Sequence, residues 1–156
     1  MTQYRQPSQS YAPRREQQQP TLPAGYLQGG YFDEKGNIKC DLLANIAEQV
    51  AKVLGDSGVT STQLRGFFMQ VRAIERRLGQ TSFPEVVPQI QKLKPLAANY
   101  VGRAKNEAER RGRPNLKLFI DRNGELAVRD EKNFKKGFIP HFESVVAYYK
   151  YHFPSK

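Results

Sequence analysis

Two histidines and one cysteine are the side chains in this sequence best suited to acid–base or nucleophilic chemistry. His141 and His152 stand eleven residues apart in a segment that we expect to be one helix. At a rise of about 1.5 Å per residue they lie about 16 Å apart along its axis, too far to share a proton or a metal ion. Cys40 adjoins an apolar helix start and is expected to act as a small hydrophobic side chain. We therefore predict no catalytic residue.

Metal and cofactor sites are not indicated either. No spacing of His, Cys and Asp resembles a set of metal ligands. The sequence has no glycine-rich phosphate loop, because Gly102 and Arg103 stand outside any strand–loop–helix pattern. The sequence predicts no metal, no cofactor and no small-molecule substrate, and it favours binding over catalysis.

Arginines at helical spacing could instead bind phosphate. Arg65, Arg72 and Arg76 fall within about 40° of one another on a helical wheel, on one shoulder of an apolar stripe. A guanidinium group can donate two hydrogen bonds to one phosphate, so these residues could follow a nucleic-acid strand. The sequence predicts an RNA-binding set that also includes cations from the next region: Arg65, Arg72, Arg76, Lys92, Lys94 and Arg103.

The alternative is a solvated charged face that only maintains solubility. Two observations weaken it: no acidic residue lies four positions from Arg65, and the 156-residue chain carries a formal net charge of +10. Such a charge favours a polyanionic partner. Aromatic RNP motifs, GXXG loops and helix-turn-helix patterns are absent from the sequence, so the expected contact is with the backbone rather than the bases.

Compartment and membrane contact are predicted from apolar runs and cysteine content. No run approaches the ~20 apolar residues that a membrane-spanning helix needs. The first twenty residues lack the hydrophobic block of a secretory signal. One cysteine suits a reducing compartment. We expect a cytoplasmic protein that does not contact membranes.

Helical periodicity predicts the elements that carry these residues. A first helix is expected from an Asp41 N-cap to Gly55, and a second from caps at residues 60–62 to a stop at Gly79. The second is the clearest, because six apolar residues recur in it at steps of three and four. These are Leu64, Phe67, Phe68, Val71, Ile74 and Leu78.

A third helical region is expected over residues 83–112, with a kink or break near Lys94 because Pro95 follows. Three arginines at its end would suit the negative pole of the helix dipole. Residues 115–130 fit a β-hairpin or a helix interrupted at Asn123-Gly124, and we favour the helix. The last helix should run from near Asp130 to about residue 153. The basic end consists of Arg110, Arg111 and Arg113, and Pro140 is expected to kink the last helix.

Residues 1–35 are rich in Gln, Pro, Ser and Gly, which predicts a disordered tail. Residues 36–156 are expected to form an all-α domain, a small bundle of about five helices. Within it, Glu75 falls in the apolar arc of its helix. Because a buried unpaired carboxylate is unfavourable, we expect a basic partner, Arg103 or Lys94, unless Glu75 lies at the edge of an interface.

Three motifs in order resemble the small subunit of type III-A CRISPR (Csm) effector complexes. They are TSTQLRGFFMQVRAIE at 60–75, KLKPLAANYVGRAKN at 92–106 and FESVVAYYKYHF at 142–153. The resemblance covers about residues 40–156. Arg65, Lys94 and Arg103 match basic positions of the family pattern. Around 113–135 the chain departs from it, because the family has a longer uninterrupted helix where this sequence carries Asn123-Gly124.

The resemblance implies a non-catalytic helical subunit of a prokaryotic antiviral ribonucleoprotein. Copies of the subunit stack along the complex and contact the backbone of the guide RNA–target RNA duplex. They face the backbone subunits and touch a polymerase-like large subunit. Two other hypotheses remain: a small basic ribonuclease that uses His141 or His152, and a helical DNA-binding or membrane-surface protein.

Overall fold

The computed structural model describes residues 20–154, so the first nineteen residues of the predicted tail lie outside it. Within the described range the regular secondary structure is helical, and the only β pairing is one isolated bridge between Phe32 and Ile38. This confirms the predicted all-α class. The helices are α1 (Cys40–Leu43), α2 (Asn45–Asp56), α3 (Ser61–Leu78), α4 (Phe83–Gln91), α5 (Leu93–Gly102), α6 (Glu107–Ala127), the π-helical η2 (Asn133–Phe138) and α7 (Ile139–His152).

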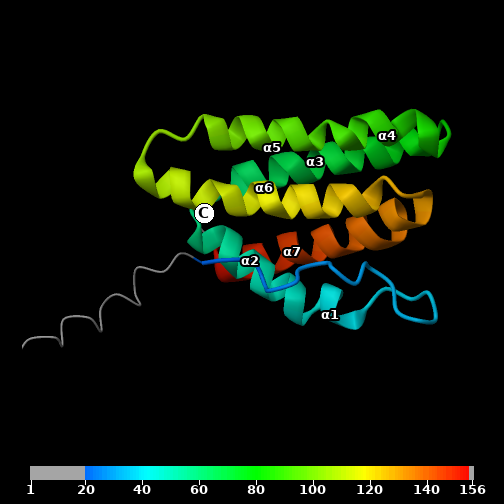
Figure 1. Cartoon of the computed structure of the whole chain (residues 1–156), viewed down its shortest axis with the longest axis horizontal. Coiled ribbons are helices and arrows are strands. Elements are labelled where there is room, and N and C mark those ends of the chain that lie inside the picture. The colour runs from blue at the N-terminus through cyan, green and yellow to red at the C-terminus, as the bar shows by residue number, and fades with distance from the viewer. Residues whose placement is uncertain (1–19, 155–156) are drawn as a thin grey trace, which may run out of the picture.

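Single residues separate α1 from α2 and α4 from α5, and η2 continues directly into α7. Counted with these pairs as continuous rods, the described chain forms five rods. Helix α7 packs against α2 and α3, and α6 packs against α5 and α2. In Figure 1, α4 and α5 run end to end along one edge, and α6 lies between them and the layer of α2 and α7. The predicted bundle of about five helices is therefore confirmed.

Helix α3 forms where its sequence predicts it. The Thr60 side chain accepts from the backbone N–H of Gln63 at 3.1 Å, and the Gln63 side chain accepts from the N–H of Thr60 at 3.0 Å. This capping box satisfies two amides at the start of the helix. Gly79 is the C-cap, and all six predicted apolar residues face the core, with Phe68 partly buried.

The first helix differs from its prediction. Lys39 occupies the N-cap position and Asp41 lies inside α1. The backbone of Ala44 (φ −131°, ψ −96°), which is neither helical nor extended, then separates α1 from α2. Gly55 lies inside α2, and the turn that follows uses Gly58 at φ +86°, a conformation that suits glycine.

The predicted break near Lys94 is confirmed at Lys92, between α4 and α5. The expectation of one region up to residue 112 is wrong, because α5 ends at Gly102 and α6 starts at Glu107. Asn106 caps α6 by accepting from the N–H of Glu109 at 2.8 Å. The three arginines therefore lie near the start of a helix. Acidic residues at that start hold them: Arg110 and Arg111 pair with Glu107, and Arg113 pairs with Glu109.

Asn123 and Gly124 do not interrupt α6, so the expected break there is wrong. The Asn123 amide is buried and donates to the Phe119 carbonyl at 2.8 Å and to the Tyr26 hydroxyl at 3.0 Å. These two hydrogen bonds stabilise Asn123 within the helix, although asparagine often ends helices. A Cβ on Gly124 would lie 3.2 Å from Cε of Lys94, so glycine leaves room for that side chain.

The last rod starts as expected, because the Asp130 carboxylate accepts from the N–H of Asn133 at 2.8 Å. This bond lowers the pKa of Asp130. Where a kink was expected at Pro140, the backbone is π-helical immediately before it, over η2. Proline has no N–H and its ring crowds the carbonyl four residues earlier, so the helix cannot keep α geometry at this point.

Residues 20–39, called here the N-terminal strap, run along the side of the bundle that carries α2 and α7 (Figure 1). Leu22, Tyr26 and Tyr31 are buried in the core, with Tyr31 only 1% exposed. The Tyr31 ring lies against Gly137, where a Cβ would clash with it. The expectation of disorder up to residue 35 is therefore wrong for residues 20–35.

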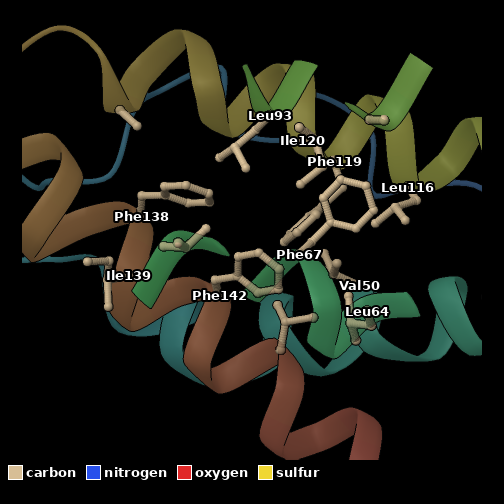
Figure 2. Packing of buried hydrophobic residues seen from close by; sticks show 14 of the residues in the cluster. Val50, Leu64, Phe67, Leu93, Leu116, Phe119, Ile120, Phe138, Ile139 and Phe142 are labelled. Atoms are coloured by element: carbon tan, nitrogen blue, oxygen red, sulfur yellow. The ribbon is translucent and has the colours of Figure 1, made fainter. Parts of the chain in front are cut away.

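Aromatic side chains join the rods at the centre of the bundle. The rings of Phe119 and Phe142 meet edge to face with centroids 5.0 Å apart, and Phe138 lies 5.7 Å from Phe142. Figure 2 shows these rings with Phe67 of α3 and Leu93 of α5 pointing toward one another. Such pairs contribute about 1 kcal/mol each beyond the burial of their area. The core thereby fixes the outer faces of α3 and α5, which carry the predicted cations.

Candidate nucleic-acid interface

The outer face of α3 carries two exposed arginines, Arg65 and Arg76. Neither takes part in an ion pair with another residue in the range 20–154. Exposed Met69 lies between them on the same face. One helix thus presents two exposed guanidinium groups that no carboxylate of residues 20–154 pairs with.

Arg72 lies on this shoulder but is engaged within the bundle. Its guanidinium contacts the carboxylate of Glu75 at 2.8 Å and that of Glu143 at 2.9 Å. It also lies 5.0 Å from the centroid of the Phe68 ring. These contacts tie α3 to α7, so a phosphate would have to compete with two carboxylates for Arg72.

The same geometry corrects the expectation for Glu75. Its partner is Arg72, one turn away on the same helix, and neither Arg103 nor Lys94. The Glu75 side chain is 33% exposed, so the wheel overstated its burial. A carboxylate at this depth keeps contact with water and needs no distant cation.

The three residues of the second motif that were predicted to bind RNA lie in different places. Lys92 is exposed at the junction of α4 and α5, and Arg103 is exposed at the C-cap of α5. Lys94 is half-buried, with its stem against Gly124 of α6. Among the described residues none of the three forms an ion pair. The structure thus gathers Arg65 and Arg76 on α3, places Arg103 on its α5 flank, and turns Lys94 toward α6.

Two hollows border the N-terminal half of α3. The first, called here the α3–α5 groove, encloses about 260 Å³ and is lined by Gln63, Gly66, Gln70, Asn99, Tyr100 and Arg103, among others. The second lies between α3 and α7, encloses about 290 Å³, and brings Arg65 next to Lys150. Sequence reasoning did not single out Gln63, although its position three residues after Thr60 marks the capping box.

The histidines do not form a catalytic pair. His141 is buried: Nδ1 donates to the Leu42 carbonyl at 2.7 Å, and Nε2 accepts from the Tyr26 hydroxyl at 2.6 Å. Burial lowers the pKa of His141 to about 4. His152 contacts the Glu48 carboxylate at 2.7 Å. Both ring nitrogens of His141 are therefore occupied, and neither is open to a substrate.

Residues 20–154 contain no cluster of three or more His, Cys, Asp or Glu side chains that could hold a metal ion. No helix in that range has the length and apolar character to cross a membrane.

Comparison with known proteins adds one finding. The family model described as Csm2 Type III-A matches residues 37–155. This range contains all six predicted cations and every helix of the described residues, and it begins inside the N-terminal strap. No curated protein and no solved structure matched the chain.

Proposed function

Because the chain belongs to the Csm2 Type III-A family, and is therefore a small subunit of a type III-A CRISPR effector, we propose that it binds RNA without cleaving it. The observation that carries this proposal is the family match over the whole helical domain. The net charge of +10 supports it, since a chain so basic attracts a polyanion.

The proposed contact surface is the outer side of α3 and α5. Arg65, Arg76, Lys92 and Arg103 are exposed there, and none is neutralised by a carboxylate of residues 20–154. Their positions suit contact with phosphates along a strand, which gives affinity without base recognition. Arg72 and Lys94 are secondary members, because the first is held by carboxylates and the second faces α6.

The proposed partners are the guide RNA and the target RNA, touched through their backbones. Further partners are copies of the chain stacked along the complex, the backbone subunits and the polymerase-like large subunit. In this role the chain would act in the prokaryotic cytoplasm as part of antiviral defence. Family membership supports a partner within the Csm complex.

The absence of catalysis is part of the proposal. It is supported by the burial of His141 and by the pairing of His152 with Glu48. The competing hypothesis of a ribonuclease needs an imidazole that can reach a ribose hydroxyl. Only His152, which is half-buried, could approach that role.

The test is co-expression with the other subunits of a type III-A complex and a CRISPR array. The chain should co-purify with guide RNA and the larger subunits, and purified chain alone should bind RNA without cleaving it. Cleavage that disappears in His152→Ala would favour a ribonuclease. A preference for duplex DNA with a sequence footprint would favour the DNA-binding alternative.

A further inference from the structure

We propose that the α3–α5 groove seats one phosphodiester group of the bound RNA, with Gln63 and Arg103 as its hydrogen-bond donors. This inference rests on the proposed function and deepens it, since it states on which flank of α3 the strand lies. The groove joins the exposed faces of α3 and α5 and ends at Arg103.

The orientation of the Gln63 amide is fixed by two donors. Its Oε1 accepts from the N–H of Thr60 at 3.0 Å and from the Tyr100 hydroxyl at 2.9 Å. An amide oxygen has two lone pairs, and both are used here. Nε2, with two N–H donors, forms no hydrogen bond with any residue in the described part of the chain. Gln63 therefore offers the groove donors only.

Tyr100, which helps to hold Gln63, is itself fixed. The Arg113 guanidinium donates to the Tyr100 carbonyl at 2.8 Å and lies 4.4 Å from the centroid of its ring. Burial raises the pKa of Tyr100, so its hydroxyl stays protonated and continues to donate to Gln63. A donor held by its neighbours in this way loses little entropy when an acceptor arrives.

The groove lining includes a glycine, Gly66, that neither the packing nor the backbone conformation of the chain requires. Gly66 lies in the interior of α3, and a Cβ built on it would meet nothing within 4 Å. Alanine would favour the helix by about 1 kcal/mol at such a position. A glycine in open space fits a surface that another molecule approaches closely.

The chemistry of the lining selects an anion with several acceptor oxygens. Arg103 supplies a guanidinium, Gln63 supplies N–H donors, and no lining residue is a carboxylate. On the opposite flank of α3, Glu75 and Glu143 surround Arg72 and lower the local positive potential. A phosphodiester strand would therefore lie on the α5 flank, where its charge meets Arg103 and no carboxylate lines the groove.

The decisive variant is Gln63→Glu. A carboxylate can accept the same two hydrogen bonds, so the capping box and the fold should persist. It replaces the groove's donors with a negative charge, and the affinity of the full chain for a labelled single-stranded RNA of mixed sequence should fall about tenfold at low salt. The matched control is Gln49→Glu at an exposed position of α2, which adds the same charge and should change affinity less than about twofold.

A second variant, Gly66→Ala, separates binding from folding. The melting temperature should stay or rise because alanine favours the helix, while RNA affinity should fall because the methyl group keeps the strand from approaching the backbone at residue 66. If both variants bind RNA as the wild type does while Arg65→Ala weakens binding, the groove inference is wrong and the proposed function stands. If Gln63→Glu instead releases a protein subunit, the groove docks protein and the inference is overturned. If the wild-type chain binds no RNA, both the groove inference and the proposed function are wrong.

Discussion

The hydroxyl of Tyr26 lies 2.6 Å from Nε2 of His141, in a buried contact between residues 115 positions apart. Because Nδ1 must donate to the Leu42 carbonyl, Nε2 can only accept, and the Tyr26 hydroxyl is the donor. The Tyr26 oxygen in turn accepts from the Asn123 amide, whose oxygen accepts from the Tyr31 hydroxyl. Each donor has an acceptor in one consistent direction. This network fixes the N-terminal strap to α6 and α7.

Tyr26→Phe should lower the free energy of unfolding by about 1–3 kcal/mol, because it leaves the His141 nitrogen without its donor and an Asn123 N–H without its acceptor. Urea denaturation followed by circular dichroism measures the change. Tyr151→Phe is the matched control: Tyr151 is 75% exposed, so removing its hydroxyl should have no effect. Equal stability of the two variants would show that the network does not hold the strap.

Stability should depend on pH through His141. Burial lowers its pKa to about 4, below the ordinary 6.5, so the unfolded chain binds a proton that the folded chain excludes. The free energy of unfolding should therefore be constant above about pH 6.5 and fall as the pH drops toward 4, by about 2 kcal/mol at pH 5. Denaturation series at pH 7, 6 and 5 measure this slope.

An NMR titration of the same histidine provides the control for that series, since other groups also add to acid sensitivity. The ring signals of His141 should stay constant between pH 7 and pH 5. Asp130 does not interfere, because its lowered pKa confines its loss of stability to lower pH. A His141 titration near 6.5 would contradict the buried hydrogen-bonded site.

Gly112→Ala should destabilise the protein by about 3 kcal/mol, since a Cβ there would clash with the backbone carbonyl of Ser57, which has little room to move. Gly102→Ala is the matched control, because a Cβ at Gly102 meets nothing within 4 Å. Thermal melts of both variants test the packing of α6 against the end of α2. Similar melting temperatures would mean that this contact is not as close as described.

Arg72 and Arg76 should behave differently although they share one shoulder of α3. Arg72→Ala removes the link to Glu75 and Glu143 and should lower the free energy of unfolding by about 0.5–1 kcal/mol, with little change in RNA affinity. Arg76→Ala should leave stability unchanged and weaken RNA binding. Paired melts and RNA titrations distinguish them, and the reverse pattern would place the RNA on the α7 flank.

Local signals allowed α3 to be predicted from the sequence. Thr60 and Gly79 mark its two ends, and the apolar steps between them are unambiguous. The start of the last rod is also set by a local contact, because the Asp130 carboxylate accepts from the backbone N–H of Asn133, three positions later. Elements whose ends are set within one turn can be predicted without knowledge of the fold.

Long-range contacts set the features that the sequence did not reveal. Tyr26 and Tyr31 stand in a Gly- and Pro-rich stretch, and long-range contacts, among them those with Asn123 and His141, order it. The hydrogen bonds with Tyr26 and Tyr31 also stabilise the helical conformation of Asn123. The exposure of Arg65 and Arg76 followed from the wheel of one helix. The ion pair between Arg72 and Glu143, 71 positions away, could not be predicted from the helical wheel of α3 alone.

The salt dependence of RNA affinity tests most directly whether open cations hold a phosphate backbone. Fluorescence anisotropy would give the slope of log Kd against log salt for the wild-type chain and for Arg65→Ala/Arg103→Ala. The wild type should show a steep slope, and the double variant should bind more weakly with a slope smaller by about 1.4, at about 0.7 per lost contact with a single strand. A double variant within about twofold of wild-type affinity and of equal slope would contradict the account.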